Sequence, residues 1–189
     1  MILEDIPVLY INLDKRTDRS EHIEKQLEGF KNVKRIKAVE TPDNGYLGCV
    51  LSHVIALEEA IQKGYGEVLI VEDDFEWVRK DRFEYPEADF DVCLLECVNK
   101  KDKFFSWNYR QVSDAEHTGA YIVKSHFYTI LRDNFMESYN NLSRENVRDY
   151  YLDIYWKKLQ KTYTFITPSE QIGKQMIGYS DIKKKIMER

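Results

Sequence analysis

Cysteine is scarce in this sequence, and no two cysteines have the spacing of a metal or redox pair. The 189 residues include three, Cys49, Cys93 and Cys97, and none of them forms a C-x-x-C pair. Small secreted domains are usually rich in disulfides, and zinc sites commonly contain closely spaced cysteine pairs. We therefore interpret the three as small core residues and not as a zinc site, with Cys93 and Cys97 on one face of a strand.

Long apolar runs are also lacking. No stretch approaches the roughly 20 apolar residues that a bilayer span needs. Glu4 and Asp5 interrupt the region where a signal peptide would be apolar. Together with the few cysteines, these absences predict a cytoplasmic protein without an integral membrane segment.

The sequence has no excess of basic residues. It contains 28 Lys and Arg against 33 Asp and Glu, a formal net charge of −5. A general nucleic-acid binder would need a basic surplus for phosphate contacts, so nucleic acid is not expected as a partner. No repeat, low-complexity tract or linker interrupts the chain, which predicts one domain over residues 1–189.

What the sequence does contain is an apolar run that ends in three acids. Val68, Leu69, Ile70 and Val71 read as a buried parallel strand, followed directly by Glu72-Asp73-Asp74. Ligands of open α/β sheets bind at the carboxyl ends of the strands, and a divalent cation prefers oxygen ligands. Glu72 and Asp74 alternate along an extended backbone, with Asp73 turned aside, which favours a metal and nucleotide site. The alternative is a solvated acidic turn.

A second apolar strand, Val8 to Ile11, leads into a polar loop with two arginines. Asp18 and Glu21 have the spacing of a capping box, which predicts a strand-to-helix loop. Arg16 and Arg19 on this loop offer donors suited to phosphate, although an ordinary charged loop is the alternative.

Further elements follow in order. A strand is expected over Val33 to Val39, and an amphipathic helix from near Gly48 to near Gly64. Ser52 and His53 lie in the first turns of this helix, where a histidine is either a ligand or a surface or capping residue.

Another buried strand, Asp91 to Glu96, ends on a carboxylate. The polar and aromatic segment 99–116, with Phe104 and Trp107, suits stacking against sugar rings or covers the core as a loop. A strand over Thr118 to Val123 and a helix containing Phe127 and Leu131 come next.

The last third of the chain mixes aromatic and polar residues. Residues 151–159 suggest another helix, residues 163–166 a last strand, and residues 171–181 an irregular segment. Asp153 stands among aromatic residues, so it is either a base with a raised pKa or a surface carboxylate.

Five sequence blocks together resemble glycosyltransferase family 25, which includes lipopolysaccharide-type and procollagen galactosyltransferases. They cover nearly the whole chain in the expected order. The blocks are Tyr10 to Arg19, Leu47 to His53, Leu69 to Asp74, Thr118 to Val123 and Ser180 to Ile182.

The resemblance implies a GT-A fold, a Rossmann-like nucleotide-sugar-binding α/β fold whose mostly parallel central sheet is flanked by helices. It also implies a UDP-sugar donor, a divalent cation, commonly Mn²⁺ with Mg²⁺ as the second choice, and inversion at the anomeric carbon. A hexose, galactose or glucose, would pass to a hydroxyl of a glycan, lipid-linked glycan or protein acceptor. The order His117-Thr118-Gly119 departs from the family pattern.

The matched positions assign the site residues. Glu72 and Asp74 match the metal-binding motif, and inversion requires a base, for which Asp153 and Glu96 are the candidates. The residues expected to bind the donor are Asn12, Leu13, Arg16, Arg19, Ser52, His53 and Asp73. Two alternatives stay open: a non-catalytic module that binds nucleotide sugars or proteins, and a phosphatase with an aspartyl nucleophile.

Overall fold

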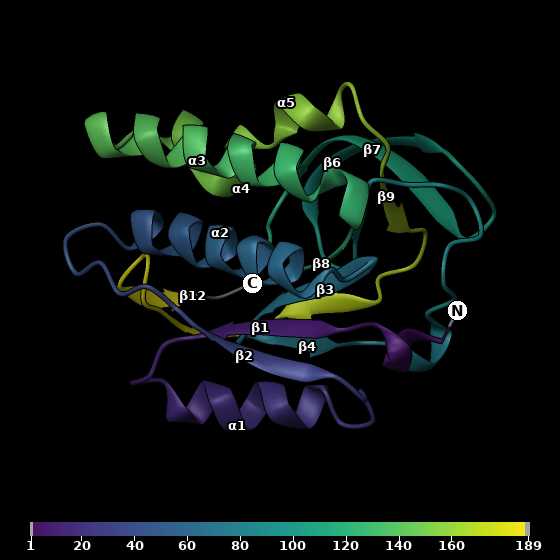
Figure 1. Cartoon of the computed structure of the whole chain (residues 1–189), viewed down its shortest axis with the longest axis horizontal. Coiled ribbons are helices and arrows are strands. Elements are labelled where there is room, and N and C mark those ends of the chain that lie inside the picture. Colours follow the sequence, from purple (N-terminus) through teal and green to yellow (C-terminus); the bar gives the residue numbers. More distant parts are fainter. Residues whose placement is uncertain (1, 188–189) are drawn as a thin grey trace.

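The computed structural model describes residues 2–187, including all of their side chains except those of residues 99 and 187. The expected domain of residues 1–189 extends beyond this range at both ends. Within the range, an eight-stranded sheet has the order β2-β1-β3-β8-β5-β9-β7-β6 (Figure 1). Its strands are β1 (Val8–Asn12), β2 (Val33–Lys37), β3 (Glu67–Glu72), β5 (Val92–Leu94), β6 (Val98–Phe104), β7 (Tyr109–Glu116), β8 (Ala120–Lys124) and β9 (Phe165–Pro168).

The direction of the strands makes this sheet mostly parallel. Strand β8 is antiparallel to β3 and β5, and β7 is antiparallel to β6 and β9. The other pairings, β1 with β2, β1 with β3 and β5 with β9, are parallel. The strands other than β7 and β8 therefore all point the same way, and the predicted α/β fold is confirmed.

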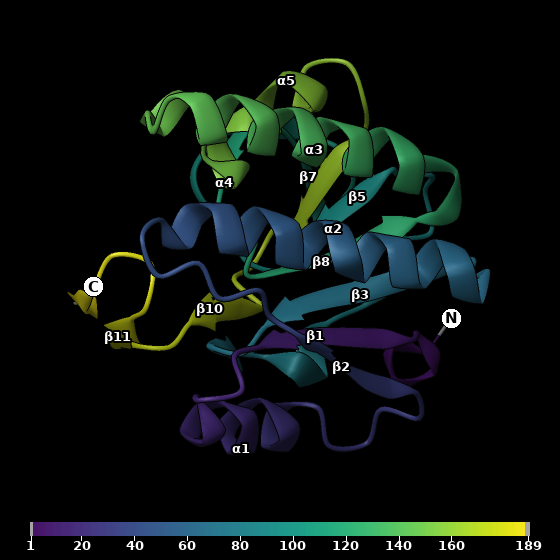
Figure 2. The ribbon, with the colours of Figure 1, turned by 60° about the vertical axis from the view of Figure 1, so that its left-hand side comes forward.

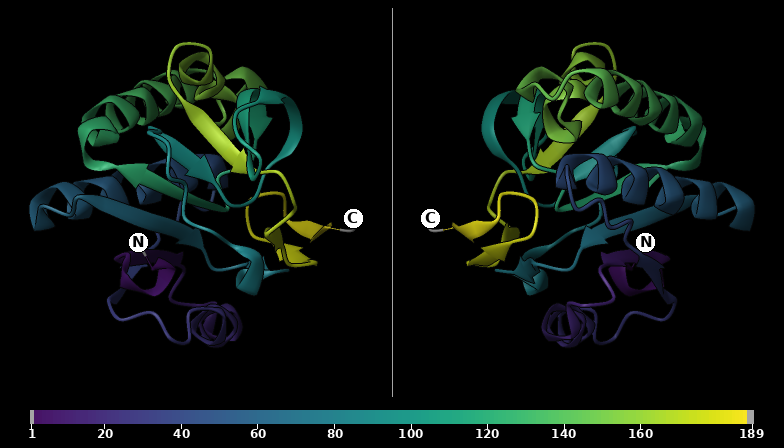
Figure 3. Two further views of the ribbon diagram at one scale, coloured as in Figure 1. Left: turned by 90° about the vertical axis from the view of Figure 1, so that its right-hand side faces the viewer. Right: turned by 90° about the vertical axis from the view of Figure 1, so that its left-hand side faces the viewer.

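Helices cover both faces of the sheet. Helices α2 (Gly45–Lys63) and α3 (Tyr128–Arg144) lie on one face, and α1 (Thr17–Gln26) lies on the other (Figure 3). Alternate residues of β1 therefore enter different cores: Leu9 packs with α2, and Tyr10 packs on the side of α1. A strand buried on both faces needs a continuous apolar run, which is why β1 and β3 could be recognised from the sequence.

Two helix starts differ from the prediction. Helix α2 begins at Gly45 rather than near Gly48, because the Asn44 side chain caps it by accepting a hydrogen bond from Tyr46 N at 3.2 Å. Helix α1 begins after Arg16 without a side-chain cap, so the expected capping box is wrong. Asp18 instead accepts hydrogen bonds from the guanidinium of Arg16.

Other segments are more regular or shorter than predicted. Residues 98–116 form the β6–β7 hairpin rather than a loop, and Tyr109 is buried. The helix expected at 151–159 is two short helices, α4 (Leu152–Tyr155) and α5 (Lys157–Gln160). Strand β5 ends at Leu94, so Cys93 and Cys97 do not share a strand.

The last residues, expected to be irregular, form short strands. Strand β10 (Gly173–Gln175) pairs with β4 (Phe75–Trp77), and β11 (Gly178–Ser180) pairs with β12 (Lys185–Met187). This segment lies beside the ends of β1 and β3 (Figure 2). Among the described residues, we find no helix of sufficient length and apolarity to cross a bilayer.

Candidate functional site

Two adjoining cavities open where β1 and β3 end. The larger has a volume of about 340 Å³, and the smaller has a volume of about 120 Å³. Both reach the first turns of α2 and the C-terminal segment. Glu72, Cys49, Gln175, Ser180 and Ile182 line both cavities, so Glu72 lies where they meet.

Most of the predicted site residues line these cavities. The larger cavity is lined by Asn12, Leu13, Arg19, Ser52, His53, Glu72, Asp73 and Asp74. The smaller one is lined by Glu96 and Asp153, the two candidate bases. Residues from separate parts of the chain therefore converge at one edge of the sheet.

Asp73 and Asp74 share one arginine. Arg19 Nη1 lies 2.9 Å from Asp73 Oδ1 and 3.0 Å from Asp74 Oδ2, and all three side chains are largely buried. Asn12 Nδ2 donates to the other oxygen of Asp73 at 2.8 Å, and Gln175 Nε2 donates to Asp74 Oδ2 at 3.0 Å. One guanidinium therefore faces two carboxylates, which leaves a surplus of negative charge.

This surplus changes the acidity of the cluster. Burial, followed by the charge of Glu72, raises the pKa of Asp74 to about 7. Burial also raises the pKa of Asp73 above its usual value, despite the opposing effect of Arg19. Asp74 Oδ1 is buried and has no hydrogen-bond partner among the described residues. An unsatisfied oxygen in an electron-rich cluster fits a hard divalent cation.

Strand β3 ends at Glu72, so Asp73 and Asp74 lie in the turn before β4. The expected alternation along an extended strand, with Asp73 turned aside, is therefore wrong, because Asp73 lies in the turn and lines the same cavity as Glu72. Asp74 nevertheless lines the same cavity as Glu72, because the turn holds it against Arg19.

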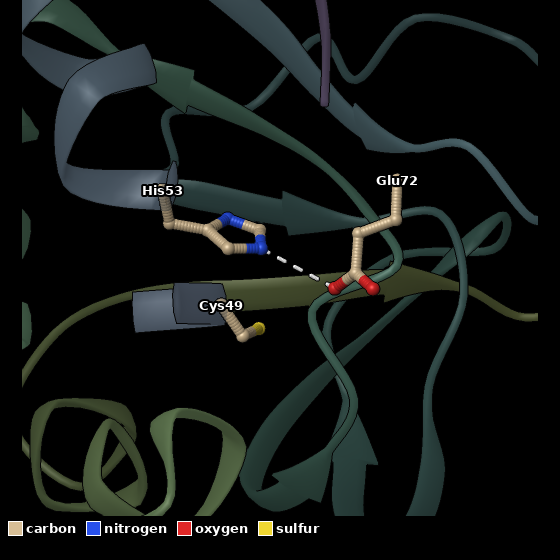
Figure 4. A group of neighbouring side chains, drawn as sticks. All are labelled: Cys49, His53 and Glu72. Carbon is tan, nitrogen blue, oxygen red and sulfur yellow. Dashed lines mark hydrogen bonds and ion pairs between the residues drawn. The ribbon is translucent and has the colours of Figure 1, made fainter. Parts of the chain in front are cut away.

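A hydrogen-bond network from three elements fixes Glu72. His53 Nε2 on α2 lies 3.3 Å from Glu72 Oε1 (Figure 4), and Thr118 Oγ1 donates to the same oxygen at 3.0 Å. Tyr121 Oη lies 2.9 Å from His53 Nδ1. Burial would raise the pKa of Glu72, but these contacts, with His53 first, lower it below its usual value.

Cys49 completes a mixed set of metal-ligand atoms. Its sulfur, a ring nitrogen of His53 and a carboxylate oxygen of Glu72 lie within 4.8 Å of one another (Figure 4). Cys49 and His53 are four residues apart on α2, so they share one helix face. The sequence interpretation of Cys49 as a small core residue outside any zinc site did not anticipate this grouping.

The smaller cavity contains a histidine held by two acids. His117 Nδ1 lies 2.6 Å from Glu96 Oε1, and the backbone N–H of His117 donates to Asp153 Oδ2 at 3.3 Å. Burial raises the pKa of Asp153 above its usual value. A Cβ on Gly119 would lie 2.8 Å from Glu96 Oε2, so the absence of a side chain at 119 leaves room for Glu96.

Arg16 and Ser52 are occupied by internal contacts. The Arg16 guanidinium binds Asp18 and Asp181, and Arg16 is not among the residues that line either cavity. Ser52 lines the larger cavity, but its hydroxyl donates to Gly48 O and accepts from Val39 N. Arg16 therefore lies outside both cavities, whereas Ser52 lines the larger one with its hydroxyl engaged by the backbone.

The exposed aromatic residues lie elsewhere. Phe104 and Trp107 form an edge-to-face pair at the tip of the β6–β7 hairpin, and neither lines the two cavities. Three contributors to the site were not singled out from the sequence: Gln175 and Lys15, which line the larger cavity, and Tyr121, which holds His53. Gln175 had no local signal, because its contact with Asp74 spans 101 positions of the chain.

Comparison of the whole chain with solved structures identifies proteins of the same fold. A glycosyltransferase involved in the glycosylation of the major capsid of PBCV-1 aligns with a TM-score of 0.61, 10% identity and coverage of 95% of this chain and 96% of that one. The glycosyltransferase GlyE of Streptococcus pneumoniae TIGR4 aligns with a TM-score of 0.54 and 9% identity over 86% of this chain, but over only 45% of its own length.

A third structure, A197 from STIV, aligns with a TM-score of 0.53 and 13% identity over 96% of this chain and 93% of that one. No protein-family profile and no curated protein matches the sequence. The structural matches support a GT-A-like fold, and the identities are too low to show more than the fold.

Proposed function

We propose that this protein is a metal-dependent, inverting glycosyltransferase. It transfers a hexose, galactose or glucose, from a UDP-sugar to a hydroxyl of a glycan, lipid-linked glycan or protein acceptor. The resemblance to family 25 supplies the donor class and the stereochemistry of this proposal. The cytoplasmic location expected from the sequence stays a prediction.

The convergence of the predicted residues on two adjoining cavities is the observation that carries this proposal. The larger cavity, at about 340 Å³, lies within the roughly 300–1,000 Å³ range of small-molecule sites. It opens at the carboxyl ends of parallel strands, where nucleotides bind in sheets of this kind. The same fold occurs in the two glycosyltransferases to which the chain is similar.

The acidic cluster fits a divalent cation. Glu72 and Asp74 would hold it, with Asp74 contributing its unpartnered Oδ1. A divalent cation held there, Mn²⁺ or Mg²⁺, would supply positive charge to the diphosphate of the leaving UDP. Arg19 keeps Asp73 and Asp74 in place, and His53 and Thr118 orient Glu72.

The two cavities would then divide the substrates. Asn12, Leu13 and Asp73 would contact the donor in the larger cavity. Glu72, at the junction of the two cavities, would lie next to the transferred sugar. The acceptor hydroxyl would enter from the smaller cavity, where Glu96 and Asp153 supply the carboxylates for proton removal.

Thermal stabilisation and UDP release test this function. UDP-galactose or UDP-glucose with Mn²⁺ should raise the melting temperature by mass action, and UDP should be released. Asp74→Ala should abolish both effects and leave the fold intact. Asp133→Asn, which changes an exposed carboxylate, serves as control. Full UDP release by Asp74→Ala would remove the acidic cluster from the mechanism.

One observation favours a non-catalytic binding module instead. Arg19 already provides a positive charge to Asp73 and Asp74, so the cluster has a partner without a metal. This alternative predicts that UDP-sugars stabilise the protein equally with and without Mn²⁺, and that no UDP is released from any donor.

A further inference from the structure

The smaller cavity contains an imidazole whose position suits proton transfer. His117 Nδ1 is engaged by Glu96, and no hydrogen bond joins Nε2 to any residue that the structure describes. The side chain of His117 is 28% exposed, whereas that of Glu96 is 2% exposed. A substrate in this cavity can therefore reach the imidazole more readily than the carboxylate behind it.

The backbone of His117 has a strained conformation where its side chain enters the smaller cavity. Its φ is 76°, in the left-handed region that non-glycine residues rarely adopt. The N–H of His117 donates to Asp153, which ties this conformation to α4. Strain of this kind persists only where surrounding contacts impose it, and it is concentrated at functional sites.

Each residue of the tripeptide 117–119 contacts or makes room for one of two carboxylates, Glu72 and Glu96. His117 binds Glu96, Thr118 donates to Glu72 at 3.0 Å, and Gly119 leaves the space that Glu96 occupies. A histidine–carboxylate pair therefore lies in the smaller cavity, directly before the residue that orients Glu72.

We propose that His117, oriented by Glu96, is the general base that deprotonates an acceptor hydroxyl bound in the smaller cavity. This inference rests on the proposed glycosyl transfer. Glu96 is then a positioning residue that fixes the Nδ1–H tautomer and leaves the Nε2 lone pair directed at the substrate. Asp153 holds the backbone of His117 rather than taking the proton.

The reaction balances as one displacement. The hydroxyl proton passes to His117 Nε2 while the hydroxyl oxygen forms a bond with the anomeric carbon. The bond from that carbon to the phosphate oxygen breaks, and its electron pair leaves with UDP. The imidazolium that results is paired with Glu96 and returns its proton to solvent.

Several charged and titratable groups surround His117. Glu96 follows β5, Asp153 lies on α4 and Glu72 ends β3, while Tyr46 and Lys183 also line the cavity. Burial lowers the pKa of His117, but the hydrogen bond and charge of Glu96 outweigh this and raise the pKa above its usual value. A more basic imidazole is a stronger proton acceptor once it is neutral.

The test uses UDP release from UDP-galactose or UDP-glucose, with water as the accepting hydroxyl. His117→Gly suits the positive φ and leaves a space for free imidazole. Its kcat should fall by about 10²–10⁴-fold, the usual contribution of a general base, with the Kd of the donor unchanged. Added imidazole should restore about tenfold or more of the lost rate, which a purely structural role would not allow.

His126→Gly, at an exposed histidine paired with Asp91, is the matched control and should not respond to imidazole. His117→Asn provides a second variant, because asparagine tolerates positive φ. Glu96→Gln removes the charge that raises the pKa of His117. The acidic limb of the pH profile of kcat should therefore move to lower pH. Failure of both His117 variants to lose rate, or absence of rescue, would overturn the assignment.

The two levels of inference fail differently. If wild-type protein binds the donors and releases no UDP, the proposed transfer is wrong, and so is the assignment of His117 as its general base. If the wild type turns over and His117→Gly retains kcat within a few-fold, only the base assignment is wrong.

Discussion

Arg19 and Asp74 form a buried ion pair, with Nη1 3.0 Å from Oδ2. The same nitrogen lies 2.9 Å from Asp73 Oδ1, and Arg19 also donates to the carbonyl of Tyr179 at 2.7 Å. One side chain of α1 thus links the turn after β3 to the C-terminal segment. Arg19 therefore supplies a positive charge that faces both Asp73 and Asp74.

Replacing Arg19 should therefore destabilise the protein strongly. Arg19→Met leaves two buried carboxylates without a counter-charge, so the free energy of unfolding should fall by about 3–5 kcal/mol in urea titrations. Arg79→Met removes an exposed ion pair with Glu170 and should change stability by about 1 kcal/mol or less. Equal losses of unfolding free energy in the two variants would show that the buried carboxylates do not depend on the charge of Arg19.

Stability without a cation should depend on pH through Asp74. Its pKa rises from 3.8 unfolded to about 7 in the folded protein. The stabilisation from this carboxyl is thus present below its unfolded pKa and lost as pH rises through about 7. The pKa of Glu72 is lowered in the folded protein. Its contribution to stability is therefore lost only as pH falls through the lowered pKa of Glu72 itself.

We expect the free energy of unfolding to decline between about pH 4 and about pH 7 in chelator, and to decline less in Asp74→Asn. Asp133→Asn should follow the wild type, because its carboxylate is exposed. A wild-type curve that is flat over this interval would contradict the raised pKa.

Cation binding should be linked to the same group. Mn²⁺ binds the ionised carboxylate, so its addition should raise the melting temperature more at about pH 8 than at about pH 6. The increase should disappear in Asp74→Asn. A stabilisation that is independent of pH and survives in this variant would place the cation elsewhere.

Much of this fold could be predicted from the sequence, for a physical reason. Strands β1 and β3 are buried on both faces, so they appear as continuous apolar runs, and β3 is followed directly by its acids. Helix α2 has a clear apolar stripe. For these three elements one local apolar pattern carries the information, and the prediction agrees with the structure.

The parts that could not be predicted depend on distant contacts. The β6–β7 hairpin has register shifts between Val98 and Asp102, which blur the alternation of a strand. Gln175 reaches Asp74 only because β10 pairs with β4. The conformation of His117 is imposed by Glu96, which follows β5, and by Asp153 on α4, so no neighbouring residues in the sequence signal it.

Gly119 offers a sensitive test of the smaller cavity. In Gly119→Ala, the new Cβ would lie 2.8 Å from Glu96 Oε2, so the carboxylate must move and its contact with His117 must change. We expect UDP release to fall about tenfold or more, since small displacements of catalytic groups are costly. Gly66→Ala is the control, because nothing lies within 4 Å of its Cβ position. Equal UDP release by the two variants would show that activity does not depend on the position of the Glu96 carboxylate.

Thiophilic cations should distinguish the two possible ligand sets at Glu72. Zn²⁺ favours sulfur and nitrogen ligands, so it should bind at Cys49, His53 and Glu72, whereas Mn²⁺ favours the carboxylates. Cys49→Ser should weaken Zn²⁺ binding by about 10–100-fold or more, measured by competition with a chromophoric chelator, and leave Mn²⁺ binding unchanged. Cys97→Ser is the matched control, since Cys97 is also a partly buried free thiol and does not belong to this group. If both variants bind Zn²⁺ as the wild type does, Cys49 is not a ligand and its sulfur only fills space beside Glu72.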